Sequence, residues 1–229
     1  MKRVITLSLI LMTLSGLKTF AQSNLKLYSN LDFVNQRTFI RSLDGTESFE
    51  DESIVGFGRP SLAISFIEEK FDHEIELSYS WKALPVSYDL DAYRYSNDRI
   101  QTRYFGFQYE LIFLRKKIGQ KMVLKLSAGS LLYWSRWERA HLTYPITLEE
   151  RIIGIQLNLI PRVEFDLGSR FMMDINSKLS IFEQNDSHWK IDDPNLPPGL
   201  RRFSQPESTF LNLDVNVRIG LVYRLRKKN

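Results

Sequence analysis

The chain has no cysteine and only three histidines, which removes much of the chemistry that enzymes use. Without cysteine there are no disulfides, no thiol nucleophiles and no thiolate metal ligands. His73, His141 and His188 are far apart in the sequence, and no nucleophile elbow, phosphate-binding loop, zinc-binding helix or calcium-loop spacing is present. We therefore expect no enzymatic activity, no metal site and no other cofactor.

Long hydrophobic runs are also missing, except at the N-terminus. There Lys2 and Arg3 precede an almost wholly apolar stretch, residues 4–17, and Thr19-Phe20-Ala21 has small residues at the two positions that a signal peptidase reads. This pattern predicts a cleaved signal peptide over residues 1–21, followed by a single domain over residues 22–229. No later stretch reaches the roughly 18 consecutive apolar residues expected of a transmembrane helix.

The chain has little net charge once this segment is removed. Loss of Lys2, Arg3 and Lys18 lowers the formal net charge from +4 to +1. The basic isoelectric point of the whole chain therefore gives no reason to expect a nucleic-acid partner.

What the chain does have is strict alternation of apolar and polar residues. From Leu211 to Leu225 every odd position is apolar, and most even positions are polar or glycine. A period of two predicts one extended strand with one apolar and one polar face. The segment is longer than ordinary globular strands of roughly 5–6 residues. It matches the roughly 9–11 residues that a tilted strand needs to cross a bilayer.

The same pattern occurs in eight segments. We expect strands over residues 24–34, 59–67, 72–82, 100–113, 121–134, 152–165, 170–181 and 211–225. Three connections are short, at 68–71, 114–119 and 166–169, whereas those at 35–58, 83–99, 135–151 and 182–208 are predicted to be long loops. This organisation predicts an all-β fold, an eight-stranded antiparallel up-and-down transmembrane β-barrel with short periplasmic turns and long extracellular loops. Both termini would then be periplasmic, and the barrel would lie in the outer membrane of a Gram-negative cell.

A soluble lipocalin-like barrel would share the strand count, but its apolar face would point inward. Two features favour the membrane. The polar face is rich in Ser, Asn, Gln and Gly, and aromatic residues collect near both ends of the apolar face, as in the interfacial girdles of membrane proteins. The expected girdles contain Phe33, Trp81, Phe105 and Trp134 at the long-loop end, and Phe66, Phe113, Phe165, Phe171 and Tyr223 at the other.

Charged residues occur on the polar face of these strands. They are Glu74, Glu76, Glu110, Glu164, Asp174, Asp214, Lys125, Arg162, Lys178, Arg218 and Arg224. The interior of an eight-stranded barrel is only wide enough to be filled by side chains, and buried charges there must be paired. We predict a salt-bridge network that plugs the lumen, with Arg162 and Arg218 each in reach of an inward carboxylate. A narrow path for ions or protons is the alternative.

The chain resembles the small eight-stranded outer-membrane proteins, the class that contains OmpX and the barrel of OmpA, over about residues 24–226. The resemblance lies in the signal peptide, the eight amphipathic strands and the alternating connections. It implies insertion by the barrel-assembly machinery, although Tyr223 is followed by six further residues and none of them is the usual terminal aromatic.

Partners of such a barrel would be outer-membrane lipid and lipopolysaccharide. The predicted loops combine aromatic residues with arginine, a composition typical of contact surfaces, so a protein partner is a further expectation. We expect a role in envelope integrity or in surface contacts. The alternatives are an accessory subunit of a secretion or uptake complex and, less favoured, a lipid-modifying enzyme.

Overall fold

The computed structural model describes residues 22–41, 47–68, 70–90, 94–141 and 146–225; at 22, 31–41, 47–58, 83–90, 94–100, 141 and 212–215 it describes the backbone alone. Its elements are β1 (Gln22–Arg41), β2 (Glu47–Ile67), β3 (Asp72–Leu90), β4 (Arg94–Ile118), β5 (Met122–His141), β6 (Thr147–Asp166), β7 (Phe171–Asp192), a 3-10 turn η2 (Pro198–Leu200) and β8 (Arg202–Leu225). No helix in the described part of the chain is long and apolar enough to cross a membrane.

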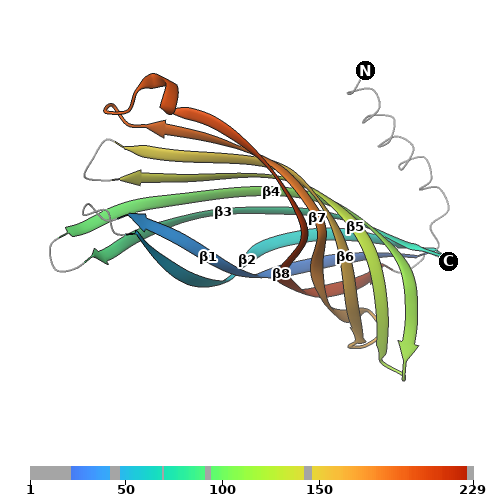
Figure 1. The fold of residues 1–229 in the computed structure, drawn as a ribbon. Coiled ribbons are helices and arrows are strands. Elements are labelled where there is room, and N and C mark those ends of the chain that lie inside the picture. Colours follow the sequence, from blue (N-terminus) through green and yellow to red (C-terminus); the bar gives the residue numbers. More distant parts are fainter. Residues whose placement is uncertain (1–21, 42–46, 69, 91–93, 142–145, 226–229) are drawn as a thin grey trace, which may run out of the picture.

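The eight strands form a closed antiparallel barrel in sequence order (Figure 1). Each strand pairs with its neighbours in the chain, and β8 returns to pair with β1 from Ser23↔Leu225 to Asp32↔Asn216. The predicted eight-stranded up-and-down barrel is therefore confirmed. Closure of the sheet leaves no open edge in this region, so the backbone donors and acceptors of all eight strands are paired there.

The polarity of the two faces is the reverse of that in a soluble barrel. On β6, Asn158, Arg162 and Glu164 are buried inside, each about 2% exposed, whereas Ile153 and Leu157 are 58% and 45% exposed on the outer face. The same alternation holds along the other strands in the described part of the barrel. A lipocalin-like barrel needs an apolar interior, so this alternative is excluded. A polar lumen and an apolar outer band define a membrane-spanning β-barrel.

Short turns close one end of the barrel, which we call the short-turn end. At the turn between β4 and β5, Gly119 has φ = 66°, a conformation that glycine adopts without steric cost. At the turn between β6 and β7, the Gly168 amide donates a hydrogen bond to the Asp166 carboxylate at 3.0 Å. The Arg224 guanidinium lies 2.9 Å from the same carboxylate and ties this turn to the end of β8. β1 begins and β8 ends at this end of the barrel.

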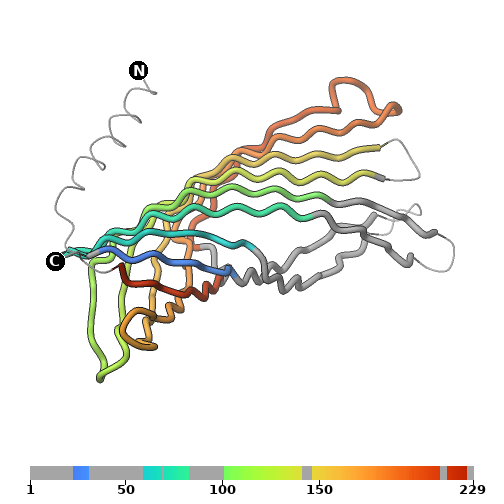
Figure 2. Tube along the Cα trace, turned by 180° about the vertical axis from the view of Figure 1, so that it is seen from behind, coloured from blue at the N-terminus to red at the C-terminus, as the bar shows by residue number. Residues whose placement is uncertain are grey.

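At the other end, which we call the hairpin end, the prediction of long loops is wrong, because most of these residues belong to paired strands. The strands continue into them, and the paired stretches reach Arg41↔Glu47, Leu90↔Arg94, Ala140↔Thr147 and Lys190↔Arg202. Figure 2 shows β5, β6 and β7 continuing side by side beyond the barrel. The segments 42–46, 91–93 and 142–145 lie outside the described residues. In most of these stretches the alternation fades, whereas over residues 84–90 it continues with apolar residues at even positions instead of the odd positions used over 75–81. Antiparallel pairing satisfies the backbone hydrogen bonds in either case.

The barrel is closed only in the part next to the short-turn end. β2 pairs with β3 from Ser61↔Ser78 to Ile67↔Asp72, and beyond Ser61↔Ser78, toward the hairpin end, the two strands are not paired. β3 to β8 then continue as a curved sheet beyond the barrel, and β1 and β2 continue as a separate hairpin (Figure 1). The closed part surrounds the candidate site.

Candidate functional site: the charge cluster in the lumen

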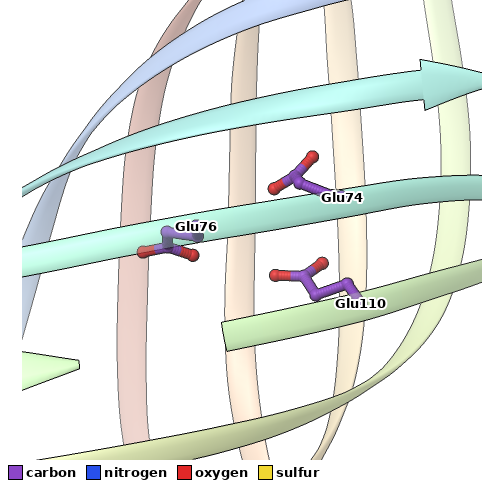
Figure 3. A group of neighbouring side chains, drawn as sticks. All are labelled: Glu74, Glu76 and Glu110. Atoms are coloured by element: carbon purple, nitrogen blue, oxygen red, sulfur yellow. The ribbon is translucent and has the colours of Figure 1, made fainter. Parts of the chain in front are cut away.

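Three glutamates converge at the centre of the lumen. Glu74 and Glu76 project from β3 and Glu110 from β4, and one carboxylate oxygen of each lies within 4.8 Å of the other two (Figure 3). All three are at most 1% exposed. They meet because β3 and β4 are adjacent and because Glu74↔Glu110 is a direct cross-strand pair. Three carboxylates that are this close together and shielded from water need cations beside them, because an unpaired buried charge is strongly destabilising.

Arg162 supplies the first of these cations. Its guanidinium lies 2.7 Å from Glu74, 2.5 Å from Glu110 and 2.9 Å from Asp174, and it is itself 2% exposed. These acids come from three different strands, and Glu74 is 88 positions away in the sequence. A planar guanidinium with five N–H donors suits this task, because it can bind several carboxylates at once.

Arg218 supplies the second cation, from β8. Its guanidinium binds Glu76, lies 2.6 Å from Glu110 and donates a hydrogen bond to the Asn176 side-chain oxygen at 2.5 Å. Lys178 approaches Glu76 at 3.7 Å from the neighbouring strand. Glu110 therefore lies between the two arginines and joins their halves of the cluster.

Two central members of the cluster were missed by the sequence analysis, Lys26 and Tyr28 on β1. The Lys26 ammonium lies 2.8 Å from Glu74, 2.9 Å from Asp174 and 3.2 Å from Glu164. The Tyr28 hydroxyl lies 2.8 Å from Asp174 and 2.9 Å from Glu74, and its ring lies under the Arg218 guanidinium at 4.8 Å. Lys26 and Tyr28 are at even positions of β1, whereas Leu25 and Leu27 on the outer face are at odd positions. This alternation alone could have assigned both residues to the lumen.

A second group of charges lies between the centre and the short-turn end. Lys125 lies 2.9 Å from Glu164 and 3.3 Å from Asp72. Asp72 was expected only to begin a strand. It is 3% exposed, and its carboxylate also forms a salt bridge with the Arg115 guanidinium at 3.4 Å. These pairs continue the network along the barrel axis.

Two further residues were predicted to belong to the network. The side chain of Asp214 is outside the described residues. Arg224 lies at the short-turn end with Asp166 and not in the central cluster.

The cluster is a network of buried acids and bases that contact one another. Each of the three glutamates that could hold an ion already contacts an arginine. Among the described residues of the lumen cluster, six buried acids face four buried bases and the half-buried Lys178. The acids are Asp72, Glu74, Glu76, Glu110, Glu164 and Asp174, and the bases are Lys26, Lys125, Arg162, Lys178 and Arg218. Such an arrangement fills the lumen with side chains that hold one another in place.

The predicted interfacial aromatics lie on the outer face. Trp81, Phe105, Phe113 and Phe171 are 56%, 47%, 42% and 46% exposed. Trp134 is half-buried and pairs with Phe105 across β4 and β5. At the short-turn end the rings of Phe171 and Tyr223 lie 5.4 Å apart. The side chain of Phe33 is outside the described residues.

The histidines do not form a catalytic arrangement in the described part of the chain. His73 contacts the Tyr109 hydroxyl at 2.8 Å near the short-turn end of β3. His188 contacts the Ser204 hydroxyl at 2.7 Å on the extension of β7 and lies 3.4 Å from Asp186. The side chain of His141 is not described. The two described histidines are therefore at opposite ends of the molecule.

Comparison with solved structures gives distant similarities to outer-membrane proteins. The structure of Ail, the attachment invasion locus protein of Yersinia pestis, in complex with the heparin analogue sucrose octasulfate, has 11% sequence identity and a TM-score of 0.44 over 90% of this chain and 100% of its own. The toluene transporter TodX of Pseudomonas putida has 8% identity and a TM-score of 0.27 over 95% of this chain and 92% of its own. No protein-family model matches the sequence, and no curated protein matches it. The fold assignment therefore rests on the strand pairing and on the polarity of the two faces.

Proposed function

We propose that this protein is a non-enzymatic outer-membrane barrel with a closed lumen, which serves envelope integrity or surface contacts through its extended hairpins. One observation carries the proposal. The largest fully buried side chains are those of the lumen, with Arg162 and Arg218 first among them, while leucine, isoleucine and aromatic side chains are exposed outside. This distribution is stable only if lipid surrounds the barrel and if the lumen is not a water-filled pore.

The orientation follows from the class. In outer-membrane barrels the short turns face the periplasm, which would place both described ends of the chain there and the hairpins outside the cell. In this location the expected partners are the barrel-assembly machinery and lipopolysaccharide.

Two measurements test the proposal. After cell fractionation, the mature chain beginning at Gln22 is expected in the outer membrane and should migrate differently on gels before and after heating. Recovery as a soluble periplasmic protein would reject the location. In planar bilayers the purified protein is expected to give little or no steady conductance, and a large stable open channel would reject the closed lumen.

A second candidate function is that of an accessory subunit in a larger envelope complex. It is favoured by apolar side chains on the extension beyond the barrel, where Leu200 and Phe203 are 62% and 47% exposed. Large exposed apolar groups outside the lipid are typical of contact surfaces. Purification from mild detergent separates the two candidates, because a stoichiometric partner is expected only for the second.

A further inference from the structure

A row of arginines follows the apolar band on the outer face at the hairpin end. Arg103 on β4, Arg136 on β5 and Arg151 on β6 are direct cross-strand partners, Arg103↔Arg136 and Arg136↔Arg151. We call these three residues the arginine row. They share one face of the sheet, because partners in register point the same way.

The row lies next to the lipid-facing residues. On the same three strands, two positions closer to the short-turn end, are Phe105, Trp134 and Ile153. These three residues are also direct cross-strand partners. Phe105 and Ile153 are 47% and 58% exposed. On each strand the outward face therefore changes from an apolar side chain to an arginine in a single step of the alternation. This step marks the boundary between the hydrocarbon and the headgroups of a lipid leaflet.

Like charges directly opposite one another destabilise a pair of strands. Within the described residues this repulsion is only partly compensated. Glu149 lies 3.1 Å from the Arg136 guanidinium and also binds Arg151, and Glu138 lies 2.9 Å from Arg136. Burial favours a raised pKa for Glu149, but the hydrogen bond from Arg151 and the charge of Arg136 outweigh it and lower the pKa. Glu149 is therefore ionised at neutral pH and holds two arginines side by side.

The arginines keep donors that these contacts do not use. A guanidinium has five N–H groups, and within the described residues Arg151 engages only its Nε, with Glu149. The Arg151 side chain is 55% exposed. The row continues onto a groove of about 710 Å³ whose lining includes Arg151, His188, Lys190 and Arg202. The lining has more cations than acids, and Arg151 connects it to the row.

We propose that the arginine row binds the phosphate groups of the glycolipid in the outer leaflet of the membrane around the barrel. Arginine forms paired hydrogen bonds with phosphate oxygens, which suits a headgroup that is fixed at this depth by its acyl chains. Lipid phosphates also supply the negative charge that the three aligned arginines need. The groove beyond Arg151 leaves room for the sugar part of the headgroup. This inference rests on the proposed location in the outer membrane.

The test uses the mature protein, folded in micelles of a detergent without phosphate, and native mass spectrometry of bound lipid. The probes are lipid A with its phosphates, the same glycolipid without phosphates, and inorganic phosphate. Replacing all three arginines of the row by alanine is expected to weaken binding of phosphorylated lipid A at least tenfold. Replacing all three by lysine is expected to retain part of the binding, because the charge remains.

The matched control replaces Lys116, Lys117 and Arg170 by alanine. These residues are exposed at the short-turn end, and their loss removes the same charge. The control is expected to bind lipid A like the parent. Every variant is checked for heat-modifiable migration and for insertion into vesicles, so that a failure of the barrel itself is seen separately from a loss of lipid binding.

Three results would overturn the inference. Equal binding by the parent and by the alanine variant would exclude the row as the site. Equal binding of the lipid without phosphates would exclude the phosphate contacts. Saturation by inorganic phosphate at the same concentration as by lipid A would indicate a site for free anions and not for a lipid.

Discussion

Removing the arginine at the centre of the lumen should destabilise the barrel more than any surface change. The two terminal nitrogens of Arg162 lie within hydrogen-bond distance of five acceptor atoms, two on Glu74 and one each on Glu110, Asp174 and the Tyr28 hydroxyl. Arg162→Ala removes the donor and leaves three carboxylates with less positive charge than they need. Breaking a buried ion pair by removal of one partner typically costs about 3–5 kcal/mol.

We expect Arg162→Ala to fall at the upper end of that range. Several acids lose a shared cation, but Lys26 and Arg218 remain nearby and limit the loss. The free energy of unfolding is measured by urea titration of the protein folded in phosphatidylcholine vesicles, with tryptophan fluorescence and gel migration as readouts. The control is Arg170→Ala, at an exposed turn position, which should change stability by less than about 0.5 kcal/mol.

A second variant checks the mechanism of this loss. In Arg162→Ala combined with Glu110→Gln, one of the unpaired charges is removed as well. The combined variant should be less destabilised than the sum of the two single variants, because residues in one ion-pair network are coupled. A change below about 1 kcal/mol for Arg162→Ala alone, against the 3–5 kcal/mol of a broken buried pair, would refute the account of the lumen as an interdependent charge cluster.

The remaining predictions concern the lipid face, the packing of the lumen and the short-turn end. Leu157→Arg, on the outer face, should cost about 2–4 kcal/mol if it lies near the bilayer midplane, whereas Asn158→Ser on the opposite face should be mild, and equal effects in vesicle unfolding would contradict the face assignment. Gly220→Ala should cost about 1–3 kcal/mol in the same assay, because a methyl group there would overlap the Tyr28 ring, and parent-like stability would show that the ring can move aside. The hydrogen bond from the β8 guanidinium, with that from the turn amide, lowers the pKa of Asp166, so its contribution to stability should be complete above the ordinary aspartate pKa and lost as the pH falls through the lowered value. Asp166→Asn should remove that part of the acid sensitivity, and an unchanged pH profile would count against the ion pair.

The strand number and the two faces of the barrel could be read from the sequence. Alternation is a local property, because successive side chains of any extended strand point to opposite sides, and it assigned Arg162, Glu74 and Asp174 to one face without knowledge of the partner strands. The three short turns were also visible, since glycine and charged residues interrupt the apolar pattern there.

The extent of the strands could not be read in this way. Alternation reports a difference between two environments, and beyond the membrane both faces of a hairpin meet water. On β3 the apolar positions are odd up to Trp81 and even from Leu84 to Leu90, so the pattern of a single continuous strand ends there, although the pairing continues from Leu90↔Arg94 to the barrel.

The contacts inside the lumen were decided by the tertiary structure. Parity indicates that a charge points inward, but register and closure determine which charges meet. Arg162 and Glu74 are 88 positions apart, and Lys26 and Asp174 are 148 positions apart, yet both pairs are brought within 3 Å by the ring of eight strands. The row formed by Arg103, Arg136 and Arg151 has the same origin, because a shift of one residue in either pairing would move an arginine to the other face.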